Sequence, residues 1–101
     1  MAGTANLQAK FTAHLLSLAQ RSNDELHFHP GYFIKMVKIQ GGVGAAKTLL
    51  AKPSASEGFD VLKKLSRLDL SMEAAVIELP WASMFTTAEL AIARARLGGG
   101  Q

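Results

Sequence analysis

The sequence contains no cysteine among its 101 residues. This absence excludes disulfides, thiolate nucleophiles, CxxC redox chemistry and cysteine-bound zinc together. No apolar run approaches the roughly 18 residues of a membrane span. The opening segment MAGTANLQAKFTAHLLSLAQ lacks the charged n-region and long apolar core of a secretory signal. We therefore expect a cytoplasmic protein with no membrane partner.

Charged residues are also few, at 19% of the chain, while hydrophobic residues make up 49%. That balance is typical of a folded globular protein and lies outside the composition of a disordered chain. A chain of 101 residues can bury one core but is too short for two well-packed ones. The sequence therefore predicts one helical domain over residues 1–97, followed by a flexible tail, GGGQ, over residues 98–101.

Acidic residues are missing from one long stretch. Residues 30–56 contain no aspartate or glutamate, but they contain four lysines, Lys35, Lys38, Lys47 and Lys52. Because the whole chain has a net charge of only +3, the excess of positive charge is local. Such a group attracts phosphates or an acidic protein surface, and it is equally the solvated face of two adjacent helices.

The N-terminal half has apolar residues at helical spacing. A first helix is predicted from about Ala5 to Ala19 or beyond, on the spacing of Leu7, Phe11, Leu15 and Leu18. Ser22, followed by Glu25, indicates either a capping box for a further turn or a polar loop. The end of this helix is therefore left open.

A second helix is predicted to begin at Pro30 and run to Ile39, with Phe33, Met36 and Val37 on one face. A strand is the alternative for FIKMVKI, but the alternation of apolar and polar residues fails there. Gly41 and Gly42 interrupt the pattern. A third helix then follows and ends before Pro53, with an apolar face of Val43, Ala46, Leu49 and Leu50.

Hydroxyl residues mark the starts of the later helices. Ser54 with Glu57 has capping-box spacing ahead of a fourth helix, whose apolar positions are Phe59, Leu62 and Leu65. Asp69 and Ser71 are candidate caps for a fifth helix that Pro80 closes. Its apolar positions are Met72, Ala75, Val76 and Leu79.

The last helix has two independent start signals. With Thr86 as the N-cap, Glu89 completes a capping box, and Phe85 and Leu90 form a hydrophobic staple. Arg94 and Arg96 then fall in the final turns, where cations complement the helix dipole. The pattern as a whole predicts an all-α fold, a compact single-domain bundle of five or six short helices.

About two thirds of the chain, from Tyr32 to Leu97, resembles a widespread group of small uncharacterised bacterial proteins. The resemblance rests on Phe33 and Met36, GGVGAAKTLL at 41–50, SEGF at 56–59, RLDLSMEAAVIELPWASMF at 67–85, Glu89, and IARARL at 92–97. It implies a mostly helical module. It implies no reaction and no catalytic residues.

Two segments suggest cofactor or metal chemistry only weakly. GGVGAAKT at 41–48 nearly matches the phosphate-binding pattern GxxxxGK[ST], but Ala46 replaces the second glycine and no preceding strand is expected. We interpret it as an interhelical turn with Lys47 facing solvent. His27 and His29, near Asp24, Glu25 and His14, are the one cluster like a metal site, and half-buried or surface histidines explain them more simply.

Possible catalytic groups also have structural explanations. Arg67, Asp69 and Glu73 suggest an acid–base group, yet helix capping by Asp69 and an ion pair with Arg67 use the same atoms. Ser71 has no surrounding nucleophile elbow. The sequence therefore favours a protein without catalysis, and we expect no cofactor and no metal.

Trp81, Met84 and Phe85 form an aromatic and methionine cluster after Pro80. Such residues are enriched at binding hot spots, but in a small domain with one Trp and five Phe they more often close the core. Extensive exposure of Trp81 would favour the binding interpretation.

The region around the two glycines has the outline of a helix-turn-helix. The residues available for phosphates or bases are Lys35, Lys38, Lys47, Thr48 and Lys52. Recognition helices usually present several Arg, Asn or Gln residues to base edges, and this one does not. The leading hypothesis is therefore a non-catalytic module that docks a protein partner or self-associates, with a DNA- or RNA-binding regulator as the alternative.

Overall fold

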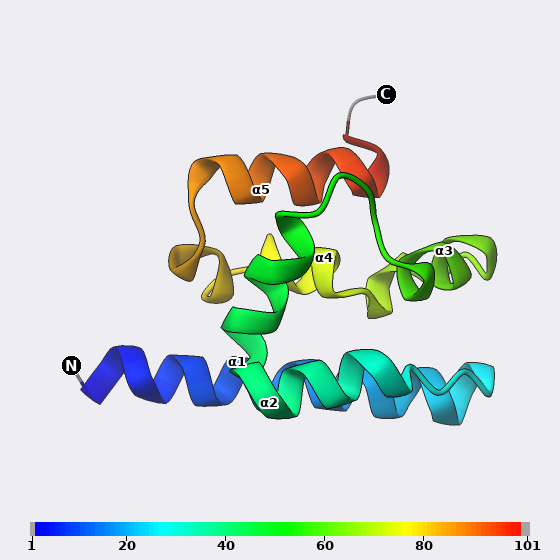
Figure 1. Cartoon of the computed structure of the whole chain (residues 1–101), viewed down its shortest axis with the longest axis horizontal. Coiled ribbons are helices and arrows are strands. Elements are labelled where there is room, and N and C mark those ends of the chain that lie inside the picture. The colour runs from blue at the N-terminus through cyan, green and yellow to red at the C-terminus, as the bar shows by residue number, and fades with distance from the viewer. Residues whose placement is uncertain (1, 100–101) are drawn as a thin grey trace. The chain divides into compact units, whose positions relative to one another are not determined.

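Residues 2–99, the part of the chain that the computed structural model describes, fold entirely as helices and connections (Figure 1). The α-helices are α1 (Ala2–Leu26), α2 (Gly31–Leu50), α3 (Glu57–Lys64), α4 (Met72–Val76) and α5 (Thr87–Arg94). Three short helical turns accompany them, η1 (Leu68–Leu70), η2 (Trp81–Met84) and η3 (Ala95–Gly99). No strand occurs within residues 2–99, so the prediction of an all-α fold is confirmed.

The chain divides into two compact units, Met1–Ala45 and Ala46–Gln101. The prediction of a single domain over 1–97 stays a prediction. Within the predicted tail, Gly98 and Gly99 belong to η3, and residues 100 and 101 lie outside the described part of the chain. Across residues 2–99, no helix combines the length and the apolar character needed to cross a bilayer.

In the first unit, α1 is longer than its sequence pattern suggested. Both interpretations of Ser22 were wrong, because Ser22 lies inside the helix, is buried, and donates a hydrogen bond of 3.1 Å from Oγ to the Leu18 carbonyl. Ion pairing of Arg21 with Glu25 one turn later, at 2.9 Å, supports the last turns of α1. The core side of α1 carries the predicted apolar stripe, with Phe11, Leu15 and Leu18 buried.

α2 runs back along α1 after a short connection and bends at Gly41 (Figure 1). Gly41 has φ 78° and ψ 162°, a conformation that only glycine adopts readily. The predicted interruption is therefore confirmed, because two helical segments meet at the Gly41 kink, although no loop separates them. The kink leaves the Gly42 N–H without its ordinary helical acceptor, and Thr12 Oγ1 of α1 accepts it at 2.8 Å.

In the second unit, α4 is the central element and contacts α5, η1, η2 and η3. Its short length is compensated by burial, because Met72, Ala75 and Val76 are all buried. α3 contacts η1 and contributes buried Phe59 and Leu62. Because α4 contacts η1, η2, α5 and η3, the ends of these short elements lie close to one another around it.

Two of the four candidate caps in this unit are confirmed. Asp69 is not a cap, because it lies inside η1 and Ser71 is the N-cap of α4. Thr86 Oγ1 accepts the Glu89 N–H at 3.1 Å while Glu89 Oε1 accepts the Thr86 N–H at 2.9 Å, which is a complete capping box. Ser71 Oγ accepts the Ala74 N–H at 3.1 Å at the start of α4. Ser54 was the wrong choice for α3, because Ser56 is the N-cap and its Oγ accepts the Phe59 N–H at 3.2 Å.

Two predicted core positions in this unit are exposed. Leu65 lies at the C-cap of α3 and is 46% exposed. Leu79 is 83% exposed, because α4 ends at Val76 and the residue falls in the turn that follows. In each case the predicted apolar face continues past the residue at which the helix ends.

Candidate functional site

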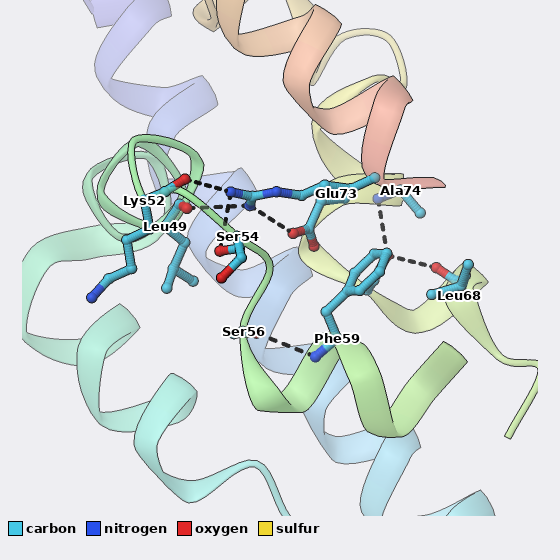
Figure 2. A network of polar contacts seen from close by, with 10 residues as sticks. Leu49, Lys52, Ser54, Ser56, Phe59, Leu68, Glu73 and Ala74 are labelled. Carbon is cyan, nitrogen blue, oxygen red and sulfur yellow. Dashed lines mark hydrogen bonds and ion pairs between the residues drawn. The ribbon is translucent and has the colours of Figure 1, made fainter. Parts of the chain in front are cut away.

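The densest polar cluster in the second unit is centred on the guanidinium of Arg96, in η3. Nη1 donates to the Leu49 carbonyl at 3.2 Å and to Glu73 Oε2 at 3.1 Å. Nη2 donates to the carbonyls of Lys52 at 3.0 Å and Ser54 at 3.3 Å. Figure 2 shows these acceptors and Glu73 converging, with dashed lines marking the hydrogen bonds.

This cluster joins the end of α2 to α4. The last carbonyls of a helix lack N–H donors from the following turn, and Arg96 supplies donors to them. The Leu49 carbonyl accepts from Arg96 in addition to the Lys52 N–H, which lies 3.3 Å away. Arg96 lies in a last helical turn, as the sequence predicted, and it also has a role that the sequence did not indicate. It acts on the C-terminal end of a different helix.

Glu73 is the most buried charged residue in the described chain, at 3% exposure. Burial raises the pKa of its carboxyl above the ordinary value of 4.5, while hydrogen bonds from its own backbone N–H and from Arg96, and the Arg96 charge, oppose the rise. A buried carboxylate of this kind requires a partner. The Arg96 pair satisfies it without any substrate.

A second polar cluster lies at the start of α5. Lys47 Nζ donates to Glu89 Oε1 at 2.7 Å, the same oxygen that accepts the Thr86 N–H. The ammonium also lies 5.2 Å from the centre of the Phe85 ring. Burial raises the pKa of Glu89, but the hydrogen bonds from Lys47 and Thr86 outweigh it, and the pKa falls below its ordinary value.

The catalytic and cofactor candidates are distributed among these structural roles. Arg67 and Asp69 form the predicted local ion pair, with Nε 3.0 Å from Oδ1. Glu73 does not join them, since it binds Arg96. Gly42 to Thr48 lie within α2, so the near match to a phosphate-binding loop is a helix, and Lys47 is paired with Glu89 rather than facing solvent alone.

The histidines do not form a metal site in the described chain. Within residues 2–99, no group of three or more His, Asp or Glu residues is placed to hold a metal ion. His27 and His29 are exposed in the connection between α1 and α2, and His27 has φ 56°.

The predicted partner-binding residues separate into two kinds. Trp81 and Met84 are half-buried on η2, while Phe85 is buried and has Lys47 over its ring. Phe85 is therefore part of the interior of this unit. Leu79, two residues before Trp81, is the large apolar side chain most open to solvent among the described residues.

The basic residues differ in their availability. Lys35, Lys38, Thr48 and Lys52 are exposed, and Lys47 is engaged by Glu89. Lys52 lies just past the end of α2, where its carbonyl accepts a hydrogen bond from Arg96. The predicted set therefore includes one cation whose charge is already balanced by a carboxylate.

Sequence reasoning missed the roles of Arg96 and Leu79. Glu73 stands within the apolar run MEAAV, and a charged residue inside such a run requires a buried partner. For Leu79 the signal is Pro80, because the residue before proline is disfavoured in helical geometry. Comparison of the chain with protein-family models, curated proteins and solved structures gave no match.

Proposed function

We propose that the protein is a non-catalytic, cytoplasmic helical module that docks a protein partner through the turn around Leu79, Trp81 and Met84. The observation that carries this proposal is the 83% exposure of Leu79 beside the half-buried Trp81. Tryptophan and methionine are enriched at protein interfaces, and Leu79 adds exposed apolar surface beside them. Kinship with the group of small bacterial helical proteins that the chain resembles is part of the same proposal.

The placement of the polar groups supports a role without catalysis. The carboxylates of Glu73 and Glu89 are bound by Arg96 and Lys47. The hydroxyls of Ser56, Ser71 and Thr86 accept helix N–H groups. A nucleophile or general base needs a free position next to a reacting group, and these side chains are used in helix ends instead.

Photo-cross-linking tests the docking turn. A benzoylphenylalanine at position 79 is expected to give discrete protein adducts in an extract of the native host. The matched control is the same probe at position 65, which replaces another exposed leucine in the same unit. Equal adducts from both positions, or none from position 79, would refute the proposal, and sedimentation of the purified chain separates a partner from self-association.

We keep nucleic-acid binding as a second candidate because Lys35, Lys38 and Lys52 are exposed and no acidic residue occurs within 30–56. If this candidate is correct, the affinity of the protein for duplex or single-stranded DNA or RNA falls steeply as salt is added, since each neutralised phosphate releases counterions. Absence of binding to any of these at low salt would eliminate it. The engaged Lys47 weakens this candidate.

A further inference from the structure

The first half of α2 carries an exposed face that combines large apolar and basic side chains. Tyr32 and Ile39 are each 73% exposed. They are seven residues apart, so they lie on nearly the same side of the helix, about 10 Å apart along its axis. Lys35 lies between them at the i+3 position and is exposed, and Lys38 is exposed beside Ile39. We call these four residues the α2 face.

The spacing on this face is typical of a contact between helices. Apolar residues that repeat every seven positions form one side of a helix–helix seam, with the intervening and flanking positions setting the choice of partner. Scattered exposed apolar residues are common on proteins and require no explanation. Two on one face, at seam spacing, form a surface on which an amphipathic helix fits.

The charges on the α2 face specify the partner further. Among residues 2–99, no ion pair forms with Lys35 or Lys38, and α2 itself contains no acidic residue. The acidic residues of the first unit are Asp24 and Glu25 of α1, and both already bind neighbours on that helix. The two lysines are therefore charges that this unit leaves uncompensated.

A second copy of the chain fits this face poorly. If the α2 faces of two copies packed together, four lysines would meet with no acid on either α2 helix to balance them. A nucleic acid would match the lysines, and its bases can stack on Tyr32, but it offers no apolar surface to Ile39, which is 73% exposed.

We propose that the α2 face docks an amphipathic helix of an acidic protein, with apolar residues of the partner on Tyr32 and Ile39 and its carboxylates on Lys35 and Lys38. This rests on the proposed function, since both require a protein partner. It concerns a surface in the first unit, whereas the Leu79 turn belongs to the second. The two proposals can therefore fail separately.

A designed peptide tests the proposal on the full chain. The probe is a helix of three heptads, about 21 residues, with leucine at the seam positions and glutamate on both flanks. Titration into the ¹⁵N-labelled protein is expected to shift the amide resonances of residues 32–39. A matched peptide with lysine in place of each glutamate is expected to bind at least about tenfold more weakly.

Variants of the protein locate the contact. Ile39→Ser and Lys35→Glu are each expected to weaken the glutamate peptide at least about tenfold. Leu65→Ser and Lys64→Glu replace exposed residues of the same kinds in the second unit, and they should leave the affinity unchanged. Circular dichroism establishes that each variant is folded, and because the replaced side chains are exposed, all four are expected to fold.

Several outcomes would overturn the proposal. These are equal affinity for the two peptides, no shift at residues 32–39 up to about millimolar peptide, or no effect of Lys35→Glu. Stronger shifts of the same amides by duplex DNA or by phosphatidylserine vesicles would replace the protein partner with another class. A dimer that is detected by sedimentation and abolished by Ile39→Ser would replace the acidic partner with a second copy of the chain. A positive cross-link at position 79 with no peptide response would leave the proposed function standing and remove only this inference.

Discussion

Arg96 and Glu73 lie 23 positions apart in the sequence and form an ion pair of 3.1 Å whose side chains are 10% and 4% exposed. The same guanidinium donates to three backbone carbonyls at and after the end of α2. One side chain therefore joins α4, the turn η3 and the segment that follows α2. Short helices are only marginally stable by themselves, so a contact that links several of them stabilises each one.

Replacing Arg96 with methionine is expected to lower the free energy of unfolding by about 3 kcal/mol, because it removes the partner of a buried carboxylate and one donor from each of three carbonyls. Of these, the Leu49 carbonyl retains a backbone donor, the Lys52 N–H. The control is Arg94→Met, since Arg94 is exposed in the last turn of α5 and should change stability by less than about 0.5 kcal/mol. Urea unfolding followed by circular dichroism measures both. Equal effects of the two substitutions would contradict the role assigned to Arg96.

A double-mutant cycle separates the ion pair from the carbonyl contacts. Adding Glu73→Gln to the Arg96→Met background removes the isolated charge, so the double variant should be more stable than Arg96→Met alone. If Glu73→Gln lowers stability equally in both backgrounds, the two residues do not couple.

The raised pKa of Glu73 gives a prediction about pH. Burial is the main cause, and it makes the folded protein hold this proton more tightly than the unfolded chain does. The stability that Glu73 contributes is therefore fully present below its unfolded pKa, near 4.5, and is lost as pH rises through the folded value. Relative to Glu73→Gln, the natural protein should become less stable as pH increases from about 4 to 7.

Urea unfolding of the two proteins across this range measures the difference directly. Groups that titrate alike in both proteins cancel, including Glu89, whose lowered pKa acts in the opposite direction. A difference that moves in favour of the natural protein as pH rises would mean that Arg96 lowers the pKa of Glu73 more than burial raises it.

Local signals in the sequence predicted the helix starts well where two of them agreed. At Thr86, the glutamate three residues later and the apolar pair around the cap both pointed to one boundary, and the capping box is present. At α3, Ser54 matched the capping-box pattern and Ser56 did not, because Phe59 occupies its third position. The chain uses Ser56, so a pattern of one residue pair was not enough to locate the boundary.

Long-range relationships could not be read from local patterns. Nothing within one turn of Arg96 carries a negative charge, and its partner Glu73 belongs to another helix. Likewise, the pairing of Lys47 with Glu89 spans 42 positions and turned an expected solvent-facing lysine into a half-buried one. Periodicity identifies which face of a helix is buried, but the packing of helices decides which polar groups meet.

The two serines before α3 provide a matched pair of substitutions. Ser56→Ala should lower the free energy of unfolding by about 1 kcal/mol, because it removes the acceptor for the Phe59 N–H. Ser54→Ala should change it by less than about 0.5 kcal/mol, since Ser54 interacts with Arg96 through its carbonyl, which alanine retains. Thermal or urea unfolding distinguishes them, and a larger loss from Ser54→Ala would return the cap to the position that the sequence suggested.

Gly42 and Gly44 follow the kink of α2 and provide the sharpest contrast in the first unit. Alanine is normally better than glycine in a helix by about 1 kcal/mol, so Gly44→Ala should be neutral or stabilising, its nearest neighbour being the Gln40 Cβ at 3.4 Å. A Cβ on residue 42 would lie 2.8 Å from the Thr12 Cα and 3.0 Å from its N.

Because those are backbone atoms of α1, no change of side-chain rotamer can relieve the clash at residue 42, and α2 must move away from α1. That movement also stretches the 2.8 Å hydrogen bond from the Gly42 N–H to Thr12 Oγ1. Gly42→Ala is therefore expected to lower the free energy of unfolding by about 1–3 kcal/mol, opposite in sign to Gly44→Ala. Urea unfolding measures both variants, and a neutral Gly42→Ala would mean that α1 and α2 do not pack as closely as this contact requires.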